Sequence, residues 1–246
     1  LLLLQALQLR AIEIDTCSED GFELDKLEHA LAQNRIAAVL VNGNFQNPLG
    51  YCMPEAKKRA LVELCERRQV PIVEDDIYGD LTYDDDRPRV CKAYDQTGNV
   101  LLCSSFSKTI APGFRVGWLA PGRWMDKVLE LKFGLTISTP PLAQRTIAEY
   151  LAVGGYARHL RSINRTYAQQ VNQYAEAIVR HFPEGTTLTR PHGNFVLWAE
   201  VPTLQDALRL QKVALTQNIA IAPGQIFSPS GRYANCIRIT CAEPFS

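Results

Sequence analysis

Short apolar segments alternate with amphipathic segments along the first half of this 246-residue chain. Residues 36–42 and 70–74 are apolar runs of strand length. The segment between them begins at Pro54 and repeats apolar residues every three or four positions, which is typical of a helix. A strand, a helix and a strand at this spacing need a crossover connection, and such crossovers join parallel strands. The pattern predicts an α/β fold in which a mostly parallel sheet carries helices on both faces.

The rest of the chain extends this pattern and then changes it. Helices are also expected at 1–10, 24–33, 123–134, 142–153 and 155–182, and strands at 11–15, 99–103 and 116–120. The last part gives strands at 194–200, 219–222 and 236–240, around a helix at 203–217 that starts with a Thr203 and Asp206 capping pattern. We therefore expect a large domain over residues 1–165 and a small α+β domain over residues 166–246.

Composition excludes several classes of function. Lysine plus arginine equals aspartate plus glutamate, 26 residues each, so no strongly basic surface points to nucleic acid or membrane. The charge runs 57–59 and 84–86 are interpreted as solvated faces. Seven scattered cysteines without C-x-x-C spacing, and four histidines without ligand spacing, indicate reduced thiols in a cytoplasmic protein without a metal. No apolar run is long enough to span a membrane.

Polar side chains follow three successive predicted strands. They are an amide, a carboxylate, a phenol, two hydroxyls and an amine: Asn47, Asp75, Tyr78, Ser105, Ser107 and Lys108. Ligands of open α/β sheets bind beyond the carboxyl ends of the strands, so we expect these side chains at one edge. Lys108 is followed by Arg115 and then by the apolar run 116–120, which places two cations between buried strands. A solvated surface loop is the alternative interpretation of this stretch.

A lysine amine can form a Schiff base with an aldehyde cofactor, and pyridoxal 5'-phosphate is the common one. Its pyridine nitrogen must stay protonated, and a buried aspartate such as Asp75 favours the protonated form. Tyr78 and Asn47 could donate hydrogen bonds to the ring oxygen. Asn47, which precedes a proline, is alternatively a turn residue.

The phosphate of such a cofactor needs hydroxyl groups and a guanidinium. Ser105, Ser107 and Arg115 are the candidates. Ser104 is interpreted as facing the core, because side chains alternate along a strand. Asp76 is interpreted as solvated or as a capping residue.

Four motifs in this order resemble the fold type I pyridoxal-phosphate enzymes of the class I/II aminotransferase family. The motifs are Asn47-Pro48-x-Gly50, Asp75-x-x-Tyr78, Ser105-x-Ser107-Lys108 and Arg115-Val116-Gly117. Within that family the chain is most similar to the aminotransferase-like domain of MocR-type GntR transcriptional regulators. By this resemblance it is a fragment that lacks the N-terminal part and the last segment of the fold, and the protein is expected to be a homodimer.

The resemblance also implies roles for single residues. Lys108 would form the internal aldimine with the cofactor, with Asp75 and Tyr78 as its catalytic neighbours. Arg238, in the apolar run 236–240, would bind the α-carboxylate of the substrate together with Asn47. A salt bridge in the protein core is the alternative interpretation of Arg238.

Two functions follow from these expectations. The first is transamination of an α-amino acid through a Lys108 Schiff base, with an amino acid and a keto acid as small-molecule partners. The alternative is an effector-sensing domain of a MocR/GntR-type regulator, which would contact DNA only through a separate N-terminal domain. A nucleotide-binding module is disfavoured, because no glycine-rich phosphate loop follows any predicted strand.

Overall fold

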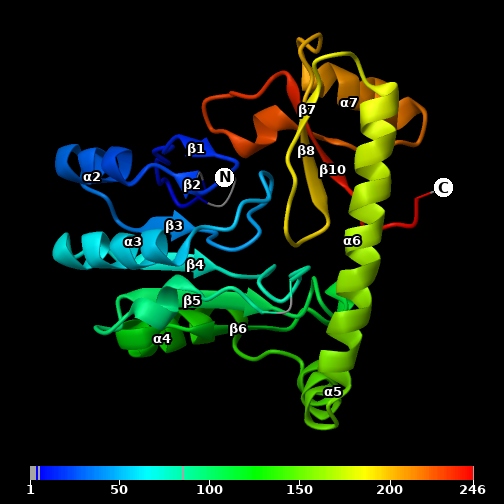
Figure 1. Ribbon diagram of the computed structural model, residues 1–246. Helices are drawn as coiled ribbons and strands as arrows, with labels where there is room; N and C mark the ends of the chain where they lie inside the picture. Colours follow the sequence, from blue (N-terminus) through cyan, green and yellow to red (C-terminus); the bar gives the residue numbers. More distant parts are fainter. Residues whose placement is uncertain (1–3, 5, 85, 246) are drawn as a thin grey trace.

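The structure, a computed structural model, describes residue 4 and residues 6–84 and 86–245. It contains two four-stranded sheets beside one long helix, with a short separate hairpin near the N-terminus (Figure 1). In spatial order, the strands of the larger sheet are β3 (Val39–Val41), β4 (Ile72–Asp75), β5 (Val100–Ser105) and β6 (Gly117–Ala120). β3, β4 and β5 are parallel, and β6 runs antiparallel to β5. The predicted α/β class with a mostly parallel sheet is confirmed.

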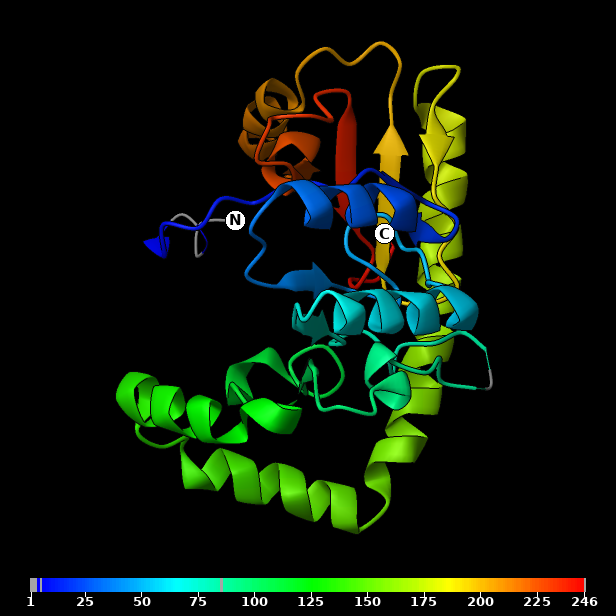
Figure 2. The same cartoon turned by 90° about the vertical axis from the view of Figure 1, so that its left-hand side faces the viewer.

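Two amphipathic helices cover one face of the larger sheet. α2 (Leu24–Gln33) has the predicted bounds, and α3 (Glu55–Arg67) starts directly after Pro54; the two lie side by side (Figure 2). Their apolar faces pack against alternate strand residues in one core. This core includes Leu27, Leu61, Cys65, Ile72 and Val100. Leu40 of β3, on the opposite face, is 67% exposed.

One lysine of α3 contradicts the expectation that the charge run 57–59 is solvated. Lys58 is only 1% exposed. Its Nζ donates hydrogen bonds to Asn44 Oδ1 at 2.5 Å and to the Arg89 carbonyl at 2.7 Å. Both acceptors come from loops outside the helix, so the spacing within α3 gave no sign of them. Lys58 is therefore a buried cation whose hydrogen bonds are satisfied by tertiary contacts.

The smaller sheet is antiparallel throughout. Its strands, in spatial order, are β7 (Thr187–Leu188), β8 (Val196–Glu200), β10 (Cys236–Thr240) and β9 (Ala222–Pro223). β10 has the predicted bounds, whereas β7 was not predicted and β9 begins at the end of its predicted range. Ala199 of β8, Ile237 of β10 and Ala207 of α7 (Ala207–Thr216) form part of its core.

The helix α6 (Gly155–His181) runs past both sheets (Figure 1). Ile163 and Tyr167, near its middle, pack against Phe195, while Val171 and Ile178 pack against the small sheet. The apolar and aromatic side chains on one face of α6 are thus part of the core. The domain boundary expected after residue 165 falls inside this helix and stays a prediction.

The remaining elements are short or lie at the edges. Two further helices in the described part of the chain are α4 (Met125–Thr136) and α5 (Pro141–Ala152). The 3-10 helices are η1 (Cys91–Tyr94), η2 (Pro112–Phe114), η3 (Gly122–Trp124) and η4 (Gly224–Phe227). Among the described residues, no helix is both long and apolar enough to cross a membrane.

The N-terminal segment differs from the prediction. Residues 1–3 and 5 of the expected helix 1–10 lie outside the described residues, and the backbone is no longer helical at Leu9 and Arg10. The strand expected at 11–15 is wrong. Instead, β1 (Thr16–Cys17) and β2 (Gly21–Phe22) form a small hairpin. The chain pairs with itself here because Gly21 adopts a positive φ of 90° that permits a tight turn.

The start of α7 gives a prediction about stability. The N-cap is Asp206, whose side chain accepts a hydrogen bond from the Leu208 N–H at 3.0 Å; Thr203 lies outside the helix. We expect Asp206→Ala to lower the free energy of unfolding by about 1 kcal/mol in urea titrations. Thr203→Ala is the matched control and should leave it unchanged. An equal loss in both variants would contradict this assignment of the cap.

Candidate functional site

Seven of the eight predicted site residues lie at the carboxyl edge of the larger sheet, and Arg238 lies on β10 of the smaller sheet. β4 and β5 pair in a register that places Asp75 opposite Cys103, and the Asp76 N–H donates to the Cys103 carbonyl at 2.9 Å. Because the strands are parallel, the turns after both of them leave the sheet at the same edge. Asp75 and Tyr78 follow one strand and Lys108 follows the other.

Lys108 is half-buried and has no polar partner among the residues that the structure describes. Its Nζ lies 5.9 Å from the centroid of the Tyr78 ring, and it makes no hydrogen bond or ion pair with any described residue. Burial raises the pKa of Asp75, an effect opposed by the Ile77 N–H, which donates to it at 3.3 Å, and by the charge of Lys108. The site thus holds an amine free of hydrogen bonds near a carboxylate that is short of them.

An amide links two of the other predicted residues. Asn47 Nδ2 donates to the Tyr78 phenol oxygen at 3.4 Å, and Arg238 Nη1 donates to Asn47 Oδ1 at 3.3 Å. Burial raises the pKa of Tyr78, with the Arg238 charge and the Asn47 hydrogen bond acting in the opposite direction. Since Tyr78 accepts from Asn47, its own proton remains available for a ligand.

The guanidinium of Arg238 is held in place but not neutralised. Its Nε is buried and has no hydrogen-bond partner in the described part of the chain, and its Cζ lies 5.5 Å from the centroid of the Phe227 ring. Burial lowers its pKa from the ordinary value, opposed by Tyr78. No carboxylate among the described residues pairs with it, so the alternative of a core salt bridge is not supported.

The expected phosphate-binding residues fall into two groups. Ser105 Oγ lies 2.8 Å from Ser107 Oγ and accepts a hydrogen bond from the Ser107 N–H at 3.0 Å, so the two hydroxyls share one turn. Arg115 has a left-handed backbone with φ of 53°, and its exposed side chain donates to the Pro112 carbonyl at 3.5 Å. The structure shows no hydrogen bond between its guanidinium and either serine.

The interpretation of Asp76 as a solvated carboxylate is wrong. Asp76 is only 2% exposed, accepts a hydrogen bond from Asn44 at 2.7 Å and pairs with Arg87. Ser104 is half-buried, and its hydroxyl donates to the Asp76 carbonyl at 3.0 Å; that it faces the core stays a prediction. Sequence reasoning missed Asn44 and Arg87, because no local pattern indicates directly that they are the partners of Asp76. The one available signal was the pair of adjacent aspartates. Neighbouring side chains of a strand point to opposite faces, so only one of the two carboxylates can face a ligand, and the other needs partners within the protein.

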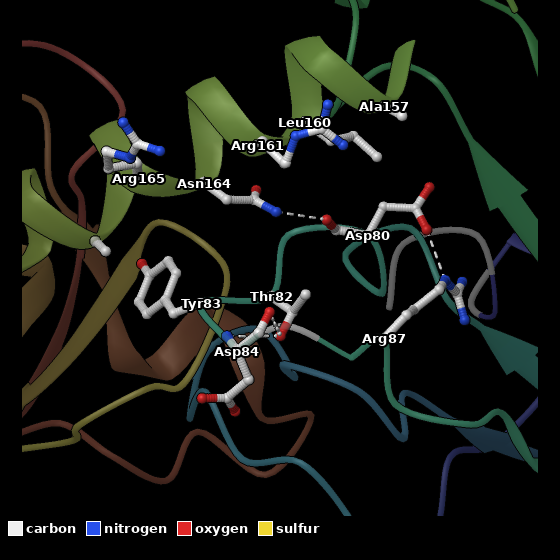
Figure 3. A pocket seen from close by; sticks show the side chains of 11 residues that line it. Asp80, Thr82, Tyr83, Asp84, Arg87, Ala157, Leu160, Arg161, Asn164 and Arg165 are labelled. Atoms are coloured by element: carbon white, nitrogen blue, oxygen red, sulfur yellow. Dashed lines mark hydrogen bonds and ion pairs between the residues drawn. The ribbon is translucent and has the colours of Figure 1, made fainter. Parts of the chain in front are cut away.

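A groove elsewhere in the structure is distinct from this edge. It has a volume of about 570 Å³ and lies between α6 and the loop that follows β4 (Figure 3). None of the eight predicted site residues lines it. In the described part of the chain no cluster of histidine, cysteine, aspartate or glutamate could hold a metal ion.

Fold and site together define a class of protein. The sequence matches the aminotransferase class I and II family over residues 3–244, and the chain belongs to that family. The expected resemblance is therefore confirmed.

Particular relatives fall into two kinds. The HTH-type transcriptional regulator YjiR of Escherichia coli K12 is 42% identical over 244 residues, 99% of this chain and 52% of YjiR. Aromatic-amino-acid aminotransferase 1 of Thermococcus litoralis is 30% identical over 227 residues, 90% of this chain and 54% of that enzyme. This chain thus spans about half the length of these two relatives.

A solved structure supports the fold. The α-aminoadipate aminotransferase LysN of Thermus thermophilus, complexed with N-(5'-phosphopyridoxyl)-L-leucine, superposes with a TM-score of 0.88 at 28% identity. The match covers 95% of this chain and 61% of LysN.

The unpaired state of Arg238 gives a second prediction. Arg238→Met keeps the contact with Phe227 and removes a charge that has no carboxylate partner among the described residues. The midpoint of unfolding should therefore lie at the same urea concentration as in the unaltered protein, or at a higher one. Arg87→Met is the control. This substitution leaves the buried Asp76 carboxylate without its ion-pair partner and should lower the free energy of unfolding by on the order of 2 kcal/mol. The loss is smaller than for a fully buried ion pair because Arg87 is partly exposed. A loss of that size in Arg238→Met would mean that Arg238 stabilises the fold.

Proposed function

We propose that this chain binds pyridoxal 5'-phosphate through Lys108 and acts on α-amino acids. The observation that carries the proposal is the unpartnered Lys108 amine beside Asp75 and Tyr78. No described residue holds this amine by a hydrogen bond, so it is free to bond a ligand, and its half-buried position close to a buried carboxylate is typical of a functional site.

The other residues fit the chemical groups of this cofactor. Burial raises the pKa of Asp75, and its carboxylate accepts a hydrogen bond only from the Ile77 N–H among the described residues, so it is suited to pair with a protonated pyridine nitrogen. Tyr78 has a free proton for the ring oxygen. The adjacent hydroxyls of Ser105 and Ser107 suit a phosphate, and Arg115 would need to turn from the Pro112 carbonyl to join them.

When bound, the cofactor supplies an aldehyde that condenses with amines and a ring that accepts electrons. The chain's own residues would then position and deprotonate the substrate. Arg238 has an unused Nε–H and can grip the α-carboxylate of an amino acid, while Asn47 holds its Nη1. Lys108 can act as the base that removes the proton from the Cα atom of the bound amino acid, and it can then return this proton to another atom on the same face of the bound molecule.

Two kinds of whole protein would use this site. We favour an aminotransferase, because enzymes with that name are among the relatives and the site holds both a candidate base and a substrate grip. An effector-sensing domain of a transcriptional regulator is the second candidate, because YjiR, which is 42% identical to this chain, is named as an HTH-type transcriptional regulator. In that case DNA contacts would come from another domain. We propose a homodimer in the cytoplasm for both.

The assignment of Lys108 is tested by trapping. We expect the protein with pyridoxal 5'-phosphate to show visible absorbance that borohydride removes, with a stable adduct on the peptide that contains Lys108. Lys108→Ala should give no such adduct, because the only amine at the site is gone. Lys127→Ala, on the exposed face of α4, is the matched control and should react as the unaltered protein does. A trapped adduct on another lysine in both variants would defeat the assignment.

The role of Arg238 is tested by separating two affinities. Arg238→Ala should weaken binding of amino acids, read as their effect on the absorbance of the bound cofactor, by at least about 30-fold. Its affinity for the cofactor alone should change little. Arg232→Ala removes an exposed arginine of the same region and should change neither. Equal losses for both ligands would make Arg238 structural.

Release of a keto acid separates the two candidate functions. An aminotransferase releases a keto acid from the amino acid and passes the amino group to a second keto acid over many turnovers. A sensor domain shows the absorbance change on binding without sustained release.

A further inference from the structure

The turn that carries Lys108 is not fixed by the sheet alone. β5 ends at Ser105, and Lys108 lies three residues beyond it in a turn. Its own side chain contributes no hydrogen bond. A segment of this kind is mobile unless other parts of the protein hold it.

Helix α6 holds the residue next to Lys108 through both backbone and side chain. Thr109 is only 3% exposed. Its carbonyl oxygen lies 2.7 Å from His159 Nε2, and its hydroxyl lies 3.1 Å from the Tyr156 phenol oxygen. The Tyr156 ring also packs edge-on against Phe106, with ring centroids 6.1 Å apart. Phe106 and Thr109 of the Lys108 turn and Tyr156 and His159 of α6 thus form one contact.

The same phenol reaches the turn that carries Tyr78. Tyr156 donates to Asp80 Oδ2 at 2.7 Å. A phenol has one proton and a carboxylate can only accept, so the Thr109 hydroxyl is the donor in its contact with Tyr156. Burial raises the pKa of Tyr156, with the neighbouring Asp80 adding to the effect, so the phenol keeps this proton.

Asp80 is itself fixed on its outer side. Asn164 of α6 donates to its carbonyl at 3.0 Å, and Arg87 Nε donates to its carboxylate at 2.6 Å (Figure 3). Asp80 follows Tyr78 by two residues. The contacts on Asp80 therefore fix the segment from which the Tyr78 ring extends toward Lys108.

We propose that Tyr156 is a positioning residue, which sets the place of Lys108 relative to Tyr78 by joining Thr109 to Asp80. The role of Lys108 in this proposal rests on the proposed function, while the bracing of the two turns does not. Neither the sheet nor the predicted motifs supply this link, since Tyr156 lies on a helix of the second half of the chain.

The bracing is tested by hydrogen exchange in the protein without cofactor. Tyr156→Phe keeps the ring packed on Phe106 and removes the hydroxyl. We expect amide exchange in residues 106–111 and 79–81 to become at least about 10-fold faster, because a hydrogen bond to a charged group is lost. Tyr174→Phe is the same substitution further along α6, where the hydroxyl contacts the Glu243 carbonyl at 3.4 Å, and it should leave both turns unchanged.

The positioning is tested with the cofactor. In Tyr156→Phe, formation of the visible adduct with pyridoxal 5'-phosphate should be roughly 10-fold slower, and the pH at which its absorbance changes should shift. Thr109→Val removes the other hydroxyl at equal volume and should give the same change. The double variant should be no worse than either single one, since both act through one contact. Thr109→Val also serves if Tyr156→Phe does not fold.

The outcomes separate the two proposals. Unchanged exchange in both turns would overturn the bracing, and faster exchange with an unchanged rate and pH profile of the adduct would overturn the positioning. Absence of any adduct in the unaltered protein would instead remove the proposed function, and the exchange result would still decide whether Tyr156 joins the two turns.

Discussion

The parallel pairing of β4 with β5 is the constraint on which the candidate site depends. It places Asp75 opposite Cys103, so the turns that carry Tyr78 and Lys108 leave the sheet side by side. The backbone bond from Asp76 to Cys103 extends this pairing one residue beyond β4. A shift by one residue would turn each side chain to the other face of the sheet. The register thus decides which polar groups meet at the edge.

The contrast between satisfied and unsatisfied charges marks the site. Lys58 and Asp76 are buried more deeply than Lys108, yet both have partners, respectively Asn44 and Arg87. Only at the edge of the sheet does the structure, over the residues it describes, leave a half-buried amine without a hydrogen bond, and Arg238 keeps a buried nitrogen unused nearby. Because unpaired polar groups destabilise a fold, their presence together favours a ligand over a structural role.

One site can serve both kinds of relative. In the function that we propose, an enzyme and an effector-sensing domain would each need an amine for the cofactor and a cation for the substrate carboxylate, so the proposed roles of Lys108 and Arg238 suit both. The two differ in the step after binding, which is release of product in an enzyme and a change passed to another domain in a sensor. α6 packs against the smaller sheet and, through Ile163 and Tyr167, joins the cluster that contains Phe45 and Tyr78 from the loops after β3 and β4, so it is one of the elements that connect the two parts of this chain.

The amino-acid sequence by itself determined most of the helices and strands and the local motifs, although it predicted a strand at 11–15 that does not form and gave no sign of β7. The strand and helix periods, and the spacings that join Asp75 to Tyr78 and Ser105 to Lys108, are short-range features that survive any arrangement of the rest. Tertiary structure alone decided the contacts between residues that are far apart in the sequence. Arg238 and Asn47, which form a hydrogen bond, are separated by 191 residues, and Tyr156 and Asp80 are separated by 76. It also buried Lys58, which the pattern of α3 placed in solvent. The physical reason is that burial and hydrogen-bond partners are set by which segments pack together, and no local pattern encodes that packing.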